Sequence, residues 1–257
     1  MPQASPDINQ KLSAEADRIV RVANDKNVTL RLLGSIAFRI HCPKYVHYLD
    51  MMERQLTDID FASYSKEKSK VEKLLADLGY TTQSYVLVAA AAFGRSIYWK
   101  RDDKELKVDI FWDRLSMNHT VDFSGRLERD RPTIPLSEML QEKLQIVKLN
   151  LKDVKDTIVL LLEHDLSKGS DDADTVDMKP MLENVSNDWG YYYTFSTNLN
   201  KIKNLLPEQQ MLTAEERATV EKRMTTLLEA FEKAPKSLRW KLRARVGTSS
   251  KWYTEVE

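Results

Sequence analysis

Hydrophobic and polar positions follow helical spacing in some segments of the first half of the chain and strand spacing in others. Residues 8–25 place apolar side chains at helical intervals among charged ones, which predicts an amphipathic helix. The apolar run 28–33 predicts a buried strand, and residues 35–41 are expected to form a helix directly after it. Residues 57–63 and 107–113 are rich in β-branched and aromatic side chains and predict two further strands. This part of the chain is therefore expected to combine a sheet with helices.

Cap and turn signals indicate two more helices in the same half. Residues 42–55 form an insertion, and their simplest interpretation is a surface helix after Pro43; the alternative is that Lys44, His47 or Arg54 reaches a substrate. Ser65 is a suitable cap for the next helix, and Gly79 is a suitable stop. The apolar stripe expected on that helix consists of Val71, Leu74, Leu75 and Leu78.

The segments on either side of Arg101 predict a strand meander. Two β-rich runs, 85–93 and 95–100, are followed by a predicted turn at 101–104 that leads into the strand at 107–113. Such a meander predicts a sheet that is mixed or partly antiparallel. Residues 119–134 are polar and irregular, and two short strands there are expected to widen the sheet.

The second half of the chain has helical spacing almost throughout. Apolar residues from Leu140 to Leu161 recur at intervals of three and four, and helix is expected again over 178–206. Residues 165–177 are acidic and predict a solvated loop, while Thr213 and Glu216 predict a capping box. The expected fold class is α+β, with a mixed-sheet domain over residues 1–134 and a helical domain over 135–257.

Composition narrows the class of protein. The chain has 257 residues, 42% of them hydrophobic and 30% charged, as in an ordinary globular protein. Lys plus Arg equals Asp plus Glu at 39 each, so no overall field attracts nucleic acid. A single cysteine, Cys42, excludes an intrachain disulfide framework, and the longest apolar run, 86–93, is too short to span a bilayer. The polar N-terminus does not resemble a secretory signal. We therefore expect a soluble, cytoplasmic protein without a membrane partner.

Three aspartates occupy strand contexts from which aspartate is normally excluded. Asp58 and Asp60 lie two residues apart, so the strand period directs both carboxylates to one face. Asp109 lies between Val108 and Ile110 in the later strand. Three such carboxylates on adjacent strands would repel one another strongly unless divalent cations lay between them. Hard oxygen ligands of this kind favour Mg²⁺ or Mn²⁺.

The order of these motifs resembles a known superfamily. Gly34-Ser35 at a strand end, a helix, Asp58-x-Asp60 and a later strand aspartate resemble the nucleotidyltransferase superfamily of the polymerase β type. Residues 142–156, EKLQIVKLNLKDVKD, are similar to the Glu-Lys-Leu and Lys-Asp-x-x-Asp segment of AbiEii-type nucleotidyltransferase proteins. Together the motifs cover residues 28–163. The chain departs from the superfamily in having one glycine before Ser35 and a long gap between Ser35 and Asp58.

The resemblance implies transfer of a nucleoside monophosphate from an NTP, such as ATP, to a hydroxyl acceptor. Gly34 and Ser35 would then hold the triphosphate. Asp58 and Asp60 would bridge two metal ions, which in such sites lie about 3.5–4 Å apart. Asp109 would hold the ion that activates the acceptor and could accept its proton.

The helical half would add further site residues by the same resemblance. Lys143 would approach the phosphates of the nucleotide, and Asp156 would assist metal or acceptor activation. Lys152 and Asp153 belong to the same motif. The competing interpretation is that lysine and aspartate three or four residues apart form surface ion pairs. The four histidines lack metal-ligand spacing and are expected to be structural or exposed; they are His41, His47, His119 and His164.

Other Asp-x-Asp chemistries fit the residues less well. A haloacid-dehalogenase phosphatase favours Thr or Val soon after its second aspartate, where this chain has Phe61-Ala62-Ser63. A manganese-dependent glycosyltransferase would need a nucleotide-sugar fold before Asp58, and too little chain precedes it. Neither a Walker loop nor a dinucleotide fingerprint occurs. A regulatory nucleotide-binding protein without turnover stays open.

The acceptor also stays open. AbiEii-like proteins include toxins of toxin–antitoxin and phage-defence pairs, some of which act on tRNA ends, so the resemblance also implies an antitoxin partner. Other members of the superfamily modify small antibiotics. The tail contains cations that could hold an RNA backbone, with Trp240 among them; they are Lys236, Arg239, Lys241, Arg243 and Arg245. The competing interpretation of this tail is a solvated terminal helix.

Overall fold

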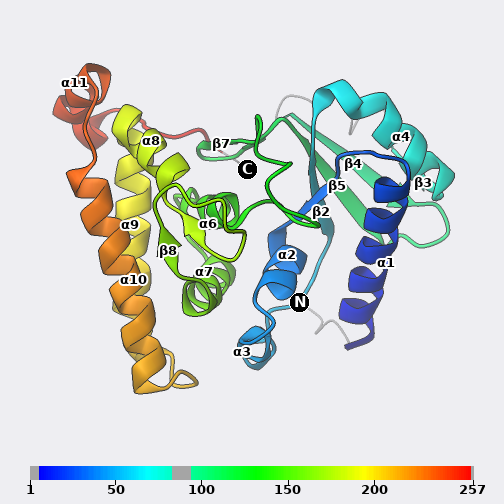
Figure 1. The fold of residues 1–257 in the computed structure, drawn as a ribbon, viewed down its shortest axis with the longest axis horizontal. Coiled ribbons are helices and arrows are strands. Elements are labelled where there is room, and N and C mark those ends of the chain that lie inside the picture. Colours follow the sequence, from blue (N-terminus) through cyan, green and yellow to red (C-terminus); the bar gives the residue numbers. More distant parts are fainter. Residues whose placement is uncertain (1–5, 83–93, 256–257) are drawn as a thin grey trace. The chain divides into compact units, whose positions relative to one another are not determined.

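The computed structural model describes residues 6–82 and 94–255 of the chain, which forms two compact units (Figure 1). The sheet unit consists of Met1–Ile40, Gln55–Ser116 and Val121–Pro135. The helical unit consists of His41–Arg54, Met117–Thr120 and Leu136–Glu257. The fold class is α+β, as expected. The run 85–93, predicted as β-rich, lies outside the described residues.

A five-stranded mixed sheet forms the centre of the sheet unit. Its strand order is β1-β2-β5-β4-β3. The central pair β2 and β5 is parallel, whereas β1–β2, β5–β4 and β4–β3 are antiparallel, which confirms the mixed sheet. The strands are β1 (Arg31–Leu33), β2 (Ile59–Ser63), β3 (Tyr80–Thr81), β4 (Arg95–Lys100) and β5 (Lys107–Trp112).

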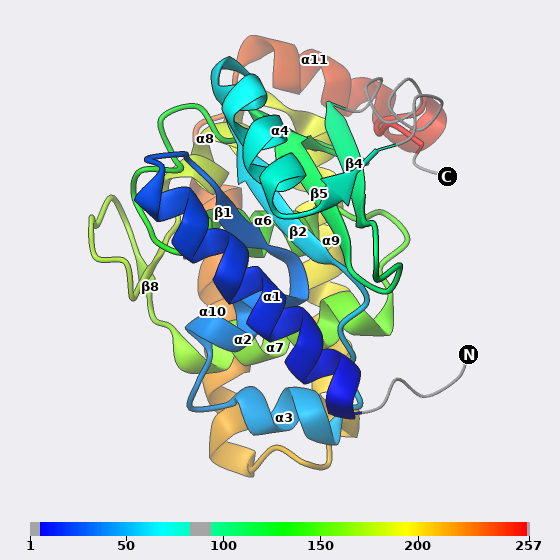
Figure 2. The ribbon, with the colours of Figure 1, turned by 90° about the vertical axis from the view of Figure 1, so that its right-hand side faces the viewer.

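Among the described residues of this unit, three α-helices accompany the sheet. Helices α1 (Pro6–Asp25) and α4 (Lys68–Asp77) lie side by side over one of its faces (Figures 1 and 2). Helix α1 buries the apolar residues that predicted it, at helical spacing: Leu12, Ala16, Ile19, Val20 and Ala23. Helix α2 (Gly34–His41) begins directly after β1. This strand-to-helix step fixes where the helix starts relative to the sheet.

Some predicted boundaries are wrong. Strand β1 begins only at Arg31, because the backbone N–H of Thr29 donates to the Glu67 carboxylate instead of to a strand. Ser65 does not cap α4; it opens a 3₁₀ turn, Ser65–Glu67, that runs into the helix. Gly79 follows the helix with a φ of +88°, as predicted for a stop. Strands β6 (Arg114–Ser116) and β7 (Thr120–Asp122) form their own sheet and do not widen the main one.

The helical unit is built from packed helices with one small parallel sheet. Helix α3 (Val46–Met51), predicted within 42–55, packs against α7, while α9 and α10 lie side by side (Figure 1). Strands β8 (Leu166–Ser167) and β9 (Val176–Asp177) lie inside the segment 165–177, so the predicted acidic loop is confined to the residues between them. The remaining helices are α6 (Leu136–Leu144), α7 (Leu151–Glu163), α8 (Lys179–Asn187), α9 (Trp189–Leu205), α10 (Ala214–Lys233) and α11 (Leu238–Val246).

Two stretches expected to be continuous helices are interrupted. The run from Leu140 to Leu161 divides into α6 and α7, because the Asn150 side chain accepts from two backbone N–H groups and caps a new helix. The Asp188 side chain accepts from one backbone N–H, that of Tyr191, and so caps α9 and separates it from α8. The capping box of Thr213 and Glu216 is confirmed at the start of α10. Among the described residues, no helix is both long enough and apolar enough to span a membrane.

Candidate functional site

The register of the two central strands places the three aspartates side by side. Asp60 pairs directly with Asp109 across the parallel β2–β5 ladder, and Ile59 pairs with Val108. Asp58 lies one residue before β2 rather than inside it, so the prediction of a strand position for Asp58 is wrong by one residue. The two-residue period still directs Asp58 and Asp60 to one face.

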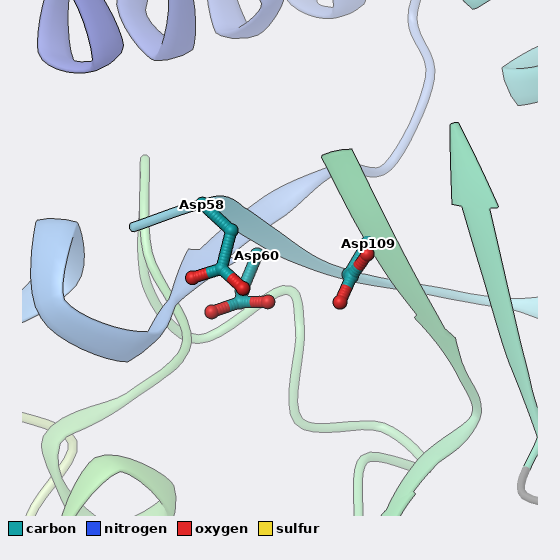
Figure 3. Close-up of side chains that lie close together, drawn as sticks. All are labelled: Asp58, Asp60 and Asp109. Carbon is teal, nitrogen blue, oxygen red and sulfur yellow. The ribbon is translucent and has the colours of Figure 1, made fainter. Parts of the chain in front are cut away.

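The carboxylates form one cluster (Figure 3). One oxygen from each of Asp58, Asp60 and Asp109 lies within 4.8 Å of the others. Asp109 is buried, while Asp58 and Asp60 are half-buried, so the cluster opens toward solvent on the Asp58 and Asp60 side. In the described part of the chain, no other group of three or more aspartate, glutamate, histidine or cysteine side chains brings its ligand atoms this close together.

Gly34 is pressed against this cluster. Leu33 pairs with Asp60 across β1 and β2, so the next residue, Gly34, begins α2 beside that carboxylate. A Cβ on Gly34 would lie 2.6 Å from Asp60 Oδ2, and the residue has a φ of +68°. Both facts require glycine. Glycine at position 34 therefore makes room for the Asp60 carboxylate, whereas the sequence suggested only that it lets a triphosphate approach the backbone. Ser35 is the second residue of α2 and is half-buried.

Two cations that sequence analysis missed lie on the cluster. Lys107 Nζ lies 2.9 Å from Asp58 Oδ2 and 3.3 Å from Asp109 Oδ2. Arg95 Nη2 lies 2.6 Å from Asp109 Oδ2. The expectation that only divalent ions could relieve the repulsion is therefore wrong, because the chain supplies two cations itself. The available signal was Lys107, which shares the face of Asp109 at a spacing of two.

These contacts shift the ionisation of the site in physically consistent directions. Burial opposes ionisation of Asp58, but the charge of Lys107 outweighs it and holds the pKa of Asp58 below its usual range. Burial raises the pKa of the deeper Asp109, with Arg95 and Lys107 offsetting part of the effect. Burial would lower the pKa of Lys107, yet Asp58 and Asp109 hold it above its usual range.

One atom of the cluster points to a missing ligand. Asp109 Oδ1 is buried and accepts no hydrogen bond from any residue that the structure describes. Buried carboxylate oxygens are normally satisfied. The set of three aspartates, with oxygen as the only donor type, fits a hard divalent cation such as Mg²⁺ or Mn²⁺.

The predicted residues of the helical unit form a second charged group within that unit. Lys143 Nζ lies 2.6 Å from Glu142 Oε1 and 3.3 Å from Asp156 Oδ2. Arg54, for which the sequence offered only the alternative of a substrate contact, holds Asp156 through two hydrogen bonds of 3.0 and 3.1 Å. The Asp156 side chain is 0% exposed. These contacts suit Asp156 to the role of positioning Lys143. A contact of Lys143 with a nucleotide stays a prediction, and so does catalysis by Asp156.

Asp153 and Lys152 have different surroundings. Burial raises the pKa of Asp153 to about 6, with Lys143 opposing the shift, and Asp153 Oδ2 has no hydrogen-bond partner among the described residues. Lys152 is exposed, and its backbone N–H donates to the Asn150 cap. Two histidines have structural contacts, as expected: His119 Nε2 lies 2.8 Å from Thr194 Oγ1, and His164 contacts two backbone carbonyls.

The basic tail forms the exposed helix α11, as the competing interpretation predicted. Only part of its charge is available to a partner. Arg243 donates to the backbone carbonyls of Gly247 and Ser250, and Lys236 lies over the rings of Tyr192 and Trp240. By contrast, three other cations are exposed and have no ion-pair partner in the described part of the chain: Arg239, Lys241 and Arg245.

Comparisons with known proteins do not assign this chain to a family. No family model matches the sequence, and no curated protein matches it. Among solved structures, the chain is similar to the antibiotic-resistance factor ANT(2'')-Ia, with 12% sequence identity and a TM-score of 0.39. The similarity covers 59% of this chain and 83% of that one. A TM-score this low does not establish a shared fold, so the function has to be argued from the site itself.

Proposed function

We propose that this protein is a metal-dependent nucleotidyltransferase, which moves a nucleoside monophosphate from an NTP to a hydroxyl acceptor and releases pyrophosphate. The observation that carries the proposal is the cluster of Asp58, Asp60 and Asp109, packed directly against Gly34 at the start of α2. The order of motifs along the sequence also resembles that of the polymerase β-type nucleotidyltransferase superfamily. The AbiEii-type assignment within it stays a prediction.

Each residue of the cluster has a distinct role in this proposal. Asp58 and Asp60, on the open side, would hold the cations that meet the triphosphate. Asp109, with its unsatisfied Oδ1, would hold the cation nearest the acceptor and take up the proton of the attacking hydroxyl. Divalent ions bound there would stabilise the charge that develops on the attacking and leaving oxygens. The first amides of α2, at Gly34 and Ser35, would bind the phosphates.

The helical unit would contribute a cation. Lys143 is held by Glu142 and Asp156, and its charge is secured because these carboxylates raise its pKa against the effect of burial. A lysine fixed in this way is a suitable partner for a triphosphate. Asp156, itself held by Arg54, would then act by fixing Lys143. This is a narrower role than the direct catalysis predicted for Asp156 from the resemblance.

For the acceptor, we propose the hydroxyl group of an RNA, with tRNA as the specific candidate. The three exposed cations of α11 that lack an ion-pair partner among the described residues support this choice, because they are available to phosphates. A small-molecule acceptor is the alternative. Measuring RNA affinity at several salt concentrations distinguishes the two acceptors.

Loss of one triad carboxylate tests the function directly. Asp60→Asn should lower transfer of label from α-³²P-labelled NTPs by on the order of 10³-fold or more, since the variant loses a ligand charge at the reacting phosphate. The assay supplies Mg²⁺, total cellular RNA and a small-molecule extract as acceptors. EDTA should abolish transfer by the wild-type protein.

A matched control separates the site from general charge loss. Asp17→Asn removes an exposed carboxylate of α1 that pairs with Arg21 and should retain full transfer. If Asp60→Asn transferred label at the wild-type rate with Mg²⁺, the proposed function would be wrong. A wild-type protein that binds NTP and transfers nothing to any acceptor would favour the nucleotide-binding protein without turnover.

A further inference from the structure

The lysine on β5 has an unusual place in the triad. Lys107 reaches two carboxylates at once, through Asp58 Oδ2 at 2.9 Å and Asp109 Oδ2 at 3.3 Å. The β2–β5 register explains this, because extending the pairing of Ile59 with Val108 by one residue brings Asp58 opposite Lys107. A cation shared by two carboxylates on neighbouring strands occupies the kind of position that a bridging divalent ion takes in a two-ion site.

The other cation of the site is held in a different way. Arg95 lies on β4 and contacts Asp109 alone, while its guanidinium group lies 5.6 Å from the centre of the Phe111 ring. This stacking and its planar shape fix Arg95 beside Asp109. The two side chains are similarly exposed, Lys107 at 28% and Arg95 at 31%, but Lys107 has a flexible stem, so it is the cation that can leave.

The charges decide how many ions the free site accommodates. The carboxylates of Asp58 and Asp109 carry two negative charges, which the positive charges of Lys107 and Arg95 already offset. On these four side chains, one divalent ion adds two positive charges, whereas two ions would add four around the buried Asp109. Excess charge of one sign in a partly buried site is unfavourable without counter-ions. The free chain is therefore suited to a single divalent ion.

We propose that Lys107 is the second cation of the triad: its ammonium group bridges Asp58 and Asp109, so that the protein without nucleotide binds one divalent ion rather than two. The inference rests on the proposed metal site and deepens it. In this arrangement Lys107 is a positioning residue that keeps Asp58 and Asp109 together until a triphosphate offers it other anionic partners.

The test counts ions on the full chain without nucleotide. Free Mn²⁺ is followed by electron paramagnetic resonance during titration of the wild type and Lys107→Met. We expect one bound ion for the wild type, and for Lys107→Met either a second ion or about tenfold tighter binding of the first, because a cation in contact with two ligands is gone. Lys107→Arg should behave as the wild type, and Asp60→Asn should bind weakly.

A control on the neighbouring strand separates this role from a general change in charge. Lys100 lies on β4, 3.2 Å from Glu15, and Lys100→Met should leave Mn²⁺ binding unchanged. If Lys107→Met does not fold, Lys107→Gln replaces it, and the wild-type count still tests the proposal.

Two bound ions in the free wild type would overturn the inference, and so would one ion of unchanged affinity in Lys107→Met. Transfer of label measured on the same preparations distinguishes this failure from that of the proposed function. Two ions with normal transfer would remove the role of Lys107 alone. No Mn²⁺ binding by any variant, together with no transfer, would remove both the metal site and the inference.

Discussion

At the scale of single residues, two independent restrictions meet at Gly34. Its backbone lies in the left-handed region, and a side chain would collide with Asp60. The collision concerns a carboxylate of the proposed metal site rather than a flexible surface group. The identity of this residue therefore links folding of the strand-to-helix step to the geometry of the site.

Gly34→Ala should destabilise the fold by about 1–3 kcal/mol, from backbone strain and the displaced Asp60 side chain. It should also weaken Mn²⁺ binding, since the carboxylate must move. Urea unfolding and a Mn²⁺ titration measure the two effects. Gly79→Ala is the matched control, because Gly79 also has a positive φ, of +88°, with nothing within 4 Å of an added Cβ. If both variants bound Mn²⁺ equally and as tightly as wild type, Asp60 would not need the space at Gly34.

Sequence reasoning found the aspartates of the site but not their partners. Asp58, Asp60 and Asp109 are conspicuous because strands rarely contain aspartate. Lys107 and Arg95 are not conspicuous, since basic residues are common on exposed strand positions. Arg95 reaches Asp109 only through the antiparallel β4–β5 register, which pairs Ile97 with Asp109. A register between strands is set by the whole sheet, so no local pattern could have revealed this contact.

At the scale of elements, α7 shows how a helix interior can carry charge. Asp156 is fully buried, and this is tolerated because Arg54 and Lys143 both contact it. Arg54 comes from the segment 41–54, and the two partners are 102 positions apart in the sequence. The predicted insertion thus gains a structural purpose, which is to neutralise a buried aspartate.

Arg54→Met should destabilise the helical unit by about 3 kcal/mol or more, because it leaves a buried carboxylate with only part of its compensation. Adding Asp156→Leu should recover some of this loss, since a buried apolar pair needs no compensation. Urea unfolding followed by circular dichroism measures both. The exposed Arg21, paired with Asp17 on α1, provides the control, and Arg21→Met should change stability by less than about 1 kcal/mol. Equal effects of Arg54→Met and Arg21→Met would contradict a buried network.

Helix periodicity predicted where helices occur better than where they end. The apolar spacing continues through residues 145–150, so α6 and α7 were expected as one helix. The break depends on a single side chain, because Asn150 accepts from the N–H groups of Lys152 and Asp153. A cap competes locally with helix continuation, and an Asn inside an apolar period reveals this competition only weakly.

At the scale of the whole molecule, charge is balanced overall and uneven locally. Lys plus Arg and Asp plus Glu each number 39, so any attraction for RNA must come from a patch. Five tail cations were candidates from the sequence, but Lys236 and Arg243 are engaged with the fold of the helical unit. Burial lowers the pKa of Lys236, which further separates it from the solvated cations. The tail cations that are exposed and not engaged in this way are Arg239, Lys241 and Arg245.

If RNA is the acceptor, these three cations should contact phosphates, and each contact adds about 0.7 to the negative slope of log affinity against log salt for a single strand. Replacing all three by Gln should therefore flatten the slope by about two units without impairing Mn²⁺ binding by the triad. RNA affinity at several salt concentrations measures this. The control replaces three exposed lysines elsewhere in the helical unit, Lys179, Lys201 and Lys222, by Gln and so removes the same charge. If the wild type and both triple variants gave parallel lines, α11 would have no part in acceptor binding, and a small-molecule acceptor would be favoured.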